Sequence, residues 1–518
     1  MSSKIRFFRS GIMLTAVALA MRTVSLFFGA FVSRTVGAEG VGIYTLVMTV
    51  YSFAVTFATS GISLTVTRLV ASKIGEGRED EVGAVLKGAI AYALFFGLLG
   101  NFILFFGAEL IGIGILSDRR TVEAIRLLSF SLAPVALGSV FSGYFVGVKR
   151  VGFNAFVQVV AQLAKIMITV ATVTVKVKEG VGSAVVGLCV SITVTEILAF
   201  GIIFLEFIYE RSKSGVKSNG GMEISGVLKM AVPLALSAYV RSVLLNIEHI
   251  LIPKKLRQRG ESETEAYSHY GILHGMALPL ILYPMSPLSS FSGLLVPEFA
   301  EDMSAGRNRR MENIATRAMT LTLSYSVICA SFIFLFAEEL GYAIYDSFDA
   351  GFYISTLALV IPIMYLDHVA DSMLKGIGEQ VFSMWVNISD SLISVALVWF
   401  LIPQMGIMGY ALVIVIMEGY NFLLSVMRLR KKIKFKIRIE EGIIRPFCAS
   451  VLSCIATRKL FSFDGKGVSG IWLALKILFA LAITVFLMIV LKNVGQRAET
   501  AFLKKKREKN GNKNKAAY

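Results

Sequence analysis

The chain has 518 residues, of which 55% are hydrophobic, a mean hydropathy of +0.71 and a formal net charge of +17. Its apolar residues form long blocks rather than the short alternations of a water-soluble core, which excludes a soluble globular protein and indicates a polytopic, all-α membrane protein. Lys and Arg gather at the edges of these blocks and in the segment 504–515. We therefore expect this charge to contact anionic lipids at the cytoplasmic face, and we expect no nucleic-acid partner.

Hydropathy predicts about fourteen spans, because uncharged runs such as 40–67 and 318–337 reach the roughly 20 residues that a helix needs to cross a bilayer. The predicted spans are 11–33, 41–64, 87–108, 124–147, 152–175, 181–208, 226–252, 270–297, 314–337, 352–375, 381–402, 405–428, 442–461 and 469–492. The first could imitate a secretory signal, but its apolar stretch continues past Arg22, so we expect it to be retained. The distribution of Lys and Arg places both termini in the cytoplasm.

An internal repeat divides these spans. In both the sixth and the twelfth span a glycine stands nine residues before a glutamate, as Gly187 and Glu196 and as Gly409 and Glu418. Equivalent helices separated by six spans indicate two six-helix lobes of parallel topology, followed by an extra helix pair. The predicted domains are 1–212, with spans one to six; 213–432, with spans seven to twelve; and 433–518, with the last two spans and a basic cytoplasmic tail.

Catalytic chemistry has no sequence signature here. The chain has no Walker loop, no Ser-His-Asp arrangement and no metal-ligand cluster. The histidines are scattered at His249, His269, His274 and His368, and the cysteines, expected to be packing residues without a disulfide or zinc site, are Cys189, Cys329, Cys448 and Cys454. We therefore expect a transporter rather than an enzyme, with no cofactor and no metal.

Two arginines lie at membrane depth. An unpaired guanidinium there costs roughly 3 kcal/mol on insertion scales. Arg22 in the first span and Arg241 in the seventh occupy equivalent points of the repeat, so folding would place both at the central interface. Either each is held by an ion pair or reaches the headgroups, or both line a hydrated cavity that receives an anion.

A polar stripe runs along the fifth span. Asn154, Gln158, Gln162 and Lys165 follow at i, i+4, i+8 and i+11, which puts them on one helix face. The eleventh span repeats the pattern more weakly around Asn387. These stripes predict a cavity lining, or else hydrogen bonds to neighbouring helices.

Four acidic residues at membrane depth are candidates for ion coupling: Glu196, Glu248, Asp390 and Glu418. Each could instead be a structural partner of a basic residue, as Glu248 could be for Arg241 two turns away on the same helix face.

Proline concentrates in the eighth span, at Pro279, Pro284, Pro287 and Pro297. Since each interior proline removes a backbone hydrogen bond, we expect this helix to be broken or bent, as a hinge or as a static kink.

The turn Val36-Gly37-Ala38-Glu39-Gly40-Val41-Gly42-Ile43-Tyr44 resembles the hallmark of polysaccharide flippases in the multidrug, oligosaccharidyl-lipid and polysaccharide superfamily. The whole chain looks most like the stage V sporulation protein B group, related to lipid II flippases. The resemblance implies a V-shaped, alternating-access pair of six-helix bundles that moves an undecaprenyl-diphosphate-linked sugar from the inner to the outer leaflet. It also implies that Arg22 and Arg241 hold the diphosphate. The resemblance does not extend to Lys165, which is a candidate only because it lies on the polar stripe.

Two alternatives stay open. A cation-coupled multidrug and toxin extrusion antiporter needs an anionic cavity; the first three spans carry no internal carboxylate, but the second lobe is acidic. A membrane-embedded glycan polymerase or ligase needs large external loops, and the predicted ones are short. The oligomeric state cannot be read from the sequence, but one chain holds a whole pathway, which is compatible with a monomer.

Overall fold

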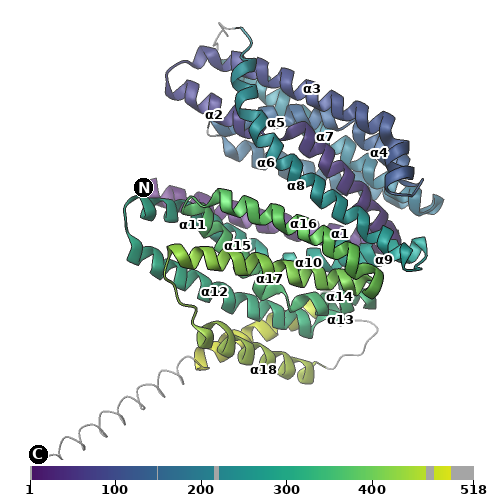
Figure 1. Cartoon of the computed structure of the whole chain (residues 1–518), viewed down its shortest axis with the longest axis vertical. Coiled ribbons are helices and arrows are strands. Elements are labelled where there is room, and N and C mark those ends of the chain that lie inside the picture. The colour runs from purple at the N-terminus through teal and green to yellow at the C-terminus, as the bar shows by residue number, and fades with distance from the viewer. Residues whose placement is uncertain (1–2, 149, 215–220, 462–471, 492–518) are drawn as a thin grey trace, which may run out of the picture. The chain divides into compact units, whose positions relative to one another are not determined.

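Helices make up nearly all of the part of the chain that the computed structural model describes, which is residues 3–148, 150–214, 221–461 and 472–491 (Figure 1). The first half contains α1 (Ser3–Thr59), α2 (Ile62–Gly75), α3 (Val82–Glu109), α4 (Thr121–Ser129), α5 (Leu132–Gly147), α6 (Val151–Lys176), α7 (Val181–Ser214), α8 (Ile224–Gln258) and α9 (Glu263–Tyr270). The second half contains α10 (Leu278–Leu282), α11 (Met285–Ser304), α12 (Asn308–Leu335), α13 (Ala337–Tyr345), α14 (Phe348–Ala358), α15 (Ile361–Gly376), α16 (Gln380–Met405), α17 (Ile407–Lys432), α18 (Arg445–Leu460) and the helix Trp472–Leu491. Short 3-10 or π turns are η1 (Glu79–Glu81), η2 (Leu110–Ile115), η3 (Val177–Glu179), η4 (Gly271–Ala277) and η5 (Glu440–Ile444).

The chain is a multi-pass, all-α membrane protein. Among the described residues, eight helices are long and apolar enough to cross a membrane, or up to eleven if each of three bent helix pairs is one span. The stretch Ala20–Gly75, at 56 residues, exceeds the roughly 20 residues of one crossing, so it holds more than one. A helix or helix pair lies at every predicted span, but the count of fourteen stays a prediction.

The turn expected at 37–44 is helical except at one residue. Gly37 has φ 77° and ψ 172°, a conformation essentially restricted to glycine, and it kinks α1 between the first two predicted spans. The helix resumes at once, so the motif after Gly37 is presented on a helix rather than on a loop.

The proline-rich eighth span is bent, as predicted. The helices on either side of Tyr283 and Pro284 meet at 59°. Two tyrosines satisfy carbonyls beside the break: the Tyr325 hydroxyl donates to the Pro284 carbonyl oxygen at 2.6 Å, and the Tyr365 hydroxyl donates to that of Ile281 at 2.8 Å. Because these carbonyls have partners, the bend is stable without a regular helix.

The contacts divide the chain into two compact units: 1–276 with 385–417, and 277–384 with 418–518. These boundaries differ from the predicted domains, which rest on the internal repeat, and the domains stay a prediction.

In the first unit α5 packs against both α3 and α7 (Figure 1). The core of this packing includes Phe141 and Phe145 of α5, and it also contains Val227 and Ala231 of α8. The Tyr239 hydroxyl of α8 further donates to the Phe57 carbonyl oxygen at 2.8 Å. The first helix of the predicted second lobe therefore packs into the core of the first.

The second unit has its own apolar cluster, in which Phe332 and Phe336 pack with Cys454, Leu473 and Ala480. All four cysteines are free, but Cys448 is exposed, so the expectation that each is a packing residue is wrong for that one. The basic segment 504–515 lies outside the described residues.

Candidate functional site

The polar stripe of α6 lines a cavity of about 580 Å³ in the first unit. Gln158, Gln162 and Lys165 come from α6, Glu196 from α7 and Ser25 from α1. The remaining lining residues are Met21, Ala155, Val157, Val159, Ala161, Thr195 and Ala199. The α6 helix period, which put the stripe on one face in the sequence, thus directs its charged end into open space between α6, α7 and α1.

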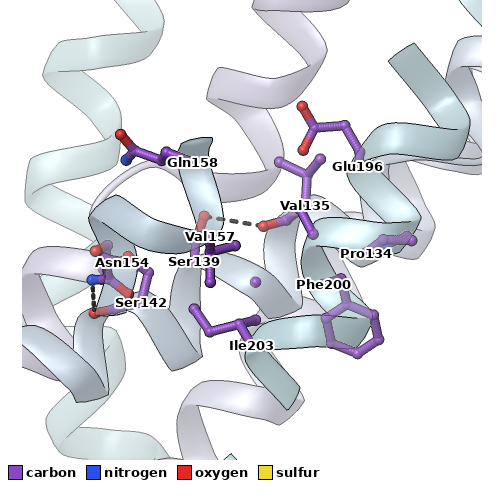
Figure 2. Close-up of a pocket in the computed structure, with 13 residues that line it drawn as sticks. Pro134, Val135, Ser139, Ser142, Asn154, Val157, Gln158, Glu196, Phe200 and Ile203 are labelled. Atoms are coloured by element: carbon purple, nitrogen blue, oxygen red, sulfur yellow. Dashed lines mark hydrogen bonds between the residues drawn. The ribbon is translucent and has the colours of Figure 1, made fainter. Parts of the chain in front are cut away.

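A second cavity of about 280 Å³ shares part of this wall (Figure 2). It is lined by Ser63 of α2, by Pro134, Val135, Gly138, Ser139 and Ser142 of α5, by Asn154, Val157 and Gln158 of α6, and by Glu196, Ala199, Phe200 and Ile203 of α7. Gln158 and Glu196 are polar residues common to both cavities. The two cavities therefore adjoin at these side chains.

The charged pair of the larger cavity is Lys165 and Glu196. Both side chains line this cavity, and they interact electrostatically. The Lys165 ammonium also lies 5.8 Å from the centre of the Phe28 ring on α1, within range of a cation–π contact. Since a carboxylate faces this ammonium, an anion that enters must compete with Glu196 for it.

Two amides of the stripe connect neighbouring helices. Asn154 Nδ2 donates to the Ser142 carbonyl oxygen on α5 at 3.0 Å, and Gln162 Nε2 donates to Ser25 Oγ on α1 at 3.3 Å. Residues of the stripe thus line cavities and also bond neighbouring helices, and their role in transport stays a prediction.

Arg22 and Arg241 lie on neighbouring helices of the first unit, α1 and α8. Both are exposed. Arg22 stands between Met21 and Ser25, which line the larger cavity, whereas neither cavity lining includes Arg241. Their role in binding stays a prediction.

A second buried polar cluster surrounds Glu248 of α8, which is 8% exposed. Its carboxylate faces Ser394 of α16 and Tyr410 of α17 and interacts with Asp390. The predicted partnership of Glu248 with Arg241 stays a prediction.

Two histidines that are scattered in the sequence meet beside this cluster. The rings of His249 and His274 are 4.6 Å apart, His249 Nδ1 lies 3.1 Å from the Tyr270 hydroxyl, and His274 Nε2 lies 2.8 Å from that of Tyr410. For the neighbouring Glu248 cluster a partial sequence signal exists, since Asp390 and Ser394 stand at i, i+4 on α16.

The remaining predicted residues lie elsewhere. Asn387 of α16 is half-buried and belongs to neither cavity lining. Glu418 of α17 is half-buried in the second unit. Neither placement tests the role predicted for it.

Comparison with known proteins gives two family matches. Residues 7–303 match the family described as polysaccharide biosynthesis protein, and residues 275–400 match the MatE family. Among curated proteins of Bacillus subtilis (strain 168), the chain is 25% identical over 447 residues to stage V sporulation protein B, covering 85% of this chain and 86% of that one. It is 22% identical over 413 residues to the lipid II flippase MurJ, covering 74% and 75%.

The fold is that of known flippases and exporters. The structure of lipid II flippase MurJ in an inward closed conformation superposes with a TM-score of 0.71 at 15% identity, covering 93% of this chain and 99% of that one. An inward-facing multidrug resistance MATE family transporter of the MOP superfamily superposes with a TM-score of 0.64 at 16% identity, covering 80% and 98%. These relatives are transporters rather than enzymes, in agreement with the expectation from the sequence.

Proposed function

The chain belongs to the polysaccharide biosynthesis protein family, within the multidrug, oligosaccharidyl-lipid and polysaccharide superfamily, and from this premise we propose that it carries an undecaprenyl-diphosphate-linked sugar from the inner to the outer leaflet by alternating access. The observation that carries the proposal is Lys165 at the end of a polar stripe, facing a cavity of about 580 Å³. A charged ammonium at membrane depth is costly, and binding an anion in this cavity would give the charge a function.

The three basic residues proposed to bind the headgroup suit a diphosphate. Arg22 and Arg241 have planar guanidinium groups that bind phosphate oxygens bidentately, and Lys165 supplies a point charge. We propose that Arg22 and Arg241 meet the headgroup from α1 and α8 while Lys165 holds it from α6. The lipid tail stays in the bilayer during this step.

The membrane potential supplies a driving force for this direction. Moving one negative charge outward across the full field is favourable by about 2.3 kcal/mol per 100 mV. Ion coupling is a further possibility for Glu196, Glu248, Asp390 and Glu418, of which Glu248 and Asp390 lie in one buried cluster.

The proposed setting is a bacterial cytoplasmic membrane with both termini in the cytoplasm. The basic ends of the spans, such as Arg430, Lys431 and Lys432 of α17, would contact anionic lipids there. The chain would act as a monomer, since the proposed pathway needs only one chain.

The buried acidic cluster favours a second candidate, a cation-coupled extrusion antiporter. Glu248 and Asp390 would bind the coupling ion, and the MatE match over residues 275–400 agrees with this reading. The sequence match to the lipid II flippase MurJ covers 74% of this chain, far more than the MatE match does, so the flippase is the function we favour.

Leaflet exchange in proteoliposomes distinguishes the two candidates. An undecaprenyl-diphosphate sugar is followed by its accessibility to an external enzyme, with wild-type protein and with Arg22→Gln and Arg241→Gln. We expect exchange with the wild type and a loss of about tenfold or more in each variant, the size of one charge-assisted hydrogen bond. Absence of lipid movement, with organic-cation efflux that depends on Glu248, would establish the antiporter instead.

A further inference from the structure

The lining of the smaller cavity is better suited to an uncharged group than to a phosphate. It combines the side chains of Ser63, Ser139, Ser142, Asn154, Gln158 and Glu196 with apolar surface that includes the Phe200 ring (Figure 2). The lining, which lies wholly within the described residues, contains no Lys or Arg. An anion would meet Glu196 there without a compensating cation, so this cavity suits an uncharged group with several hydroxyls.

Asn154 gives an independent indication of a ligand. This side chain is 9% exposed, and its Nδ2 donates to the Ser142 carbonyl oxygen. Its Oδ1 is buried and has no hydrogen-bond partner in the part of the chain that the structure describes. A buried acceptor without a donor is unfavourable, and a hydroxyl bound in this cavity would supply the donor.

The order of the cavities along α6 matches the order of groups in the proposed substrate. Asn154 and Lys165 are eleven residues apart, about 16 Å along the helix axis at 1.5 Å per residue. Gln158 lies between them and, with Glu196, lines both cavities. If Lys165 holds the phosphates of a ligand, the group attached to those phosphates therefore lies at this junction of the two cavities.

We propose that the smaller cavity is a subsite for the sugar ring next to the diphosphate, an inference that rests on the proposed function. Asn154 Oδ1 and the Glu196 carboxylate accept hydrogen bonds from its hydroxyls, Gln158 contacts it at the junction, and Phe200 packs against its apolar face. This subsite would make transport depend on the sugar and not only on the diphosphate.

Gly138 on α5 offers a steric test. A Cβ built there meets no atom within 4 Å, and the residue lines the smaller cavity, so Gly138→Val fills the cavity without a clash at its Cβ. Gly201→Val on α7 is the matched control, because its Cβ also meets nothing within 4 Å and it lines neither cavity. Asn154→Leu is a second variant, of similar side-chain size, that removes the acceptor.

Exchange is measured for two lipids, undecaprenyl diphosphate and the same lipid bearing one sugar. We expect Gly138→Val and Asn154→Leu to lower the ratio of sugar-bearing to sugar-free exchange by about tenfold, the value of roughly one hydrogen bond, and Gly201→Val to leave it unchanged. Wild-type ratios in both cavity variants, each with a wild-type unfolding temperature, would overturn the subsite while the flippase stands. Failure of the wild type to move either lipid would overturn the proposed function and the subsite with it.

Discussion

Arg120 and Glu39 form an ion pair 2.7 Å long that connects the loop before α4 to the motif after the first predicted span. Arg120 also pairs with Asp118 at 2.9 Å and lies 3.7 Å from Glu263 on α9. Burial alone would lower the pKa of Arg120, but its hydrogen bonds to Asp118 and Glu39 outweigh this and raise it. The guanidinium is therefore a permanent cation that holds together three segments predicted to lie outside the membrane.

Arg120→Gln should destabilise the protein. Asp118, 3% exposed, and Glu39 would lose their cation, at a cost of about 1–2 kcal/mol, since Arg120 is itself 35% exposed and partly screened. The control is Arg126→Gln, whose pair with Glu109 is 43% and 67% exposed and should matter by less than about 0.5 kcal/mol. Thermal unfolding in detergent measures both effects. Equal effects of the two substitutions would contradict the claim that Arg120 holds these three segments together.

Gly42 allows the close approach of α1 to α9. A Cβ at this position would lie 2.0 Å from the Tyr267 carbonyl oxygen, a backbone atom that cannot turn away. We expect Gly42→Ala to cost about 1–3 kcal/mol of stability through overpacking. Gly29→Ala, on the same helix with nothing within 4 Å of its Cβ, should be neutral or stabilising by up to about 1 kcal/mol. Unfolding temperatures that move in the same direction by the same amount would rule out this contact.

Stability at neutral pH should depend on Glu379, between α15 and α16, and this dependence should disappear at acid pH. Hydrogen bonds from Arg428 and then from Lys432 hold the pKa of this carboxyl below its ordinary value of 4.5. A lowered pKa in the folded state contributes stability above pH 4.5, and the contribution is lost as pH falls through the lower folded value. Unfolding temperatures of wild type and Glu379→Gln should therefore differ at neutral pH and converge below pH 4.5; a constant difference would contradict the assignment.

Glu196→Gln should strengthen binding of a sugar-free diphosphate lipid. The Glu196 carboxylate shares the larger cavity with Lys165 and opposes an incoming anion. Removing one such charge is worth about 1 kcal/mol in a hydrated site, or roughly fivefold in affinity. Equilibrium binding of undecaprenyl diphosphate measures it, with Glu206→Gln on the same helix as the control. Equal or weaker binding by Glu196→Gln would contradict the claim that this carboxylate opposes an anion in the larger cavity.

Features that depend on a local pattern could be predicted from the sequence. Long apolar runs located the helices, because crossing a bilayer sets a minimum length and composition. Four prolines in one span predicted the bend beside Pro284. The helix period predicted that Gln158, Gln162 and Lys165 share a face, and these three residues line one cavity.

Features that depend on the packing of distant segments could not be predicted. Arg120 and Glu39 are 81 positions apart, and nothing in either segment identifies the other as its partner. His249 and His274 come from different helices, so only the fold brings their rings together. The smaller cavity requires α2, α5, α6 and α7 at once, and its α5 residues follow no pattern in the sequence that marks a site.

The central claim is that Lys165 holds an anionic headgroup during transport, and a charge substitution with a control on the same helix tests it most directly. Lys165→Gln removes the ammonium from the cavity, whereas Lys176→Gln removes one from the end of α6, where it lies 3.9 Å from Glu179. Leaflet exchange of an undecaprenyl-diphosphate sugar should fall by about tenfold or more in the first variant and stay at the wild-type rate in the second. Equal rates for wild type, Lys165→Gln and Lys176→Gln, with all three proteins folded, would contradict the account.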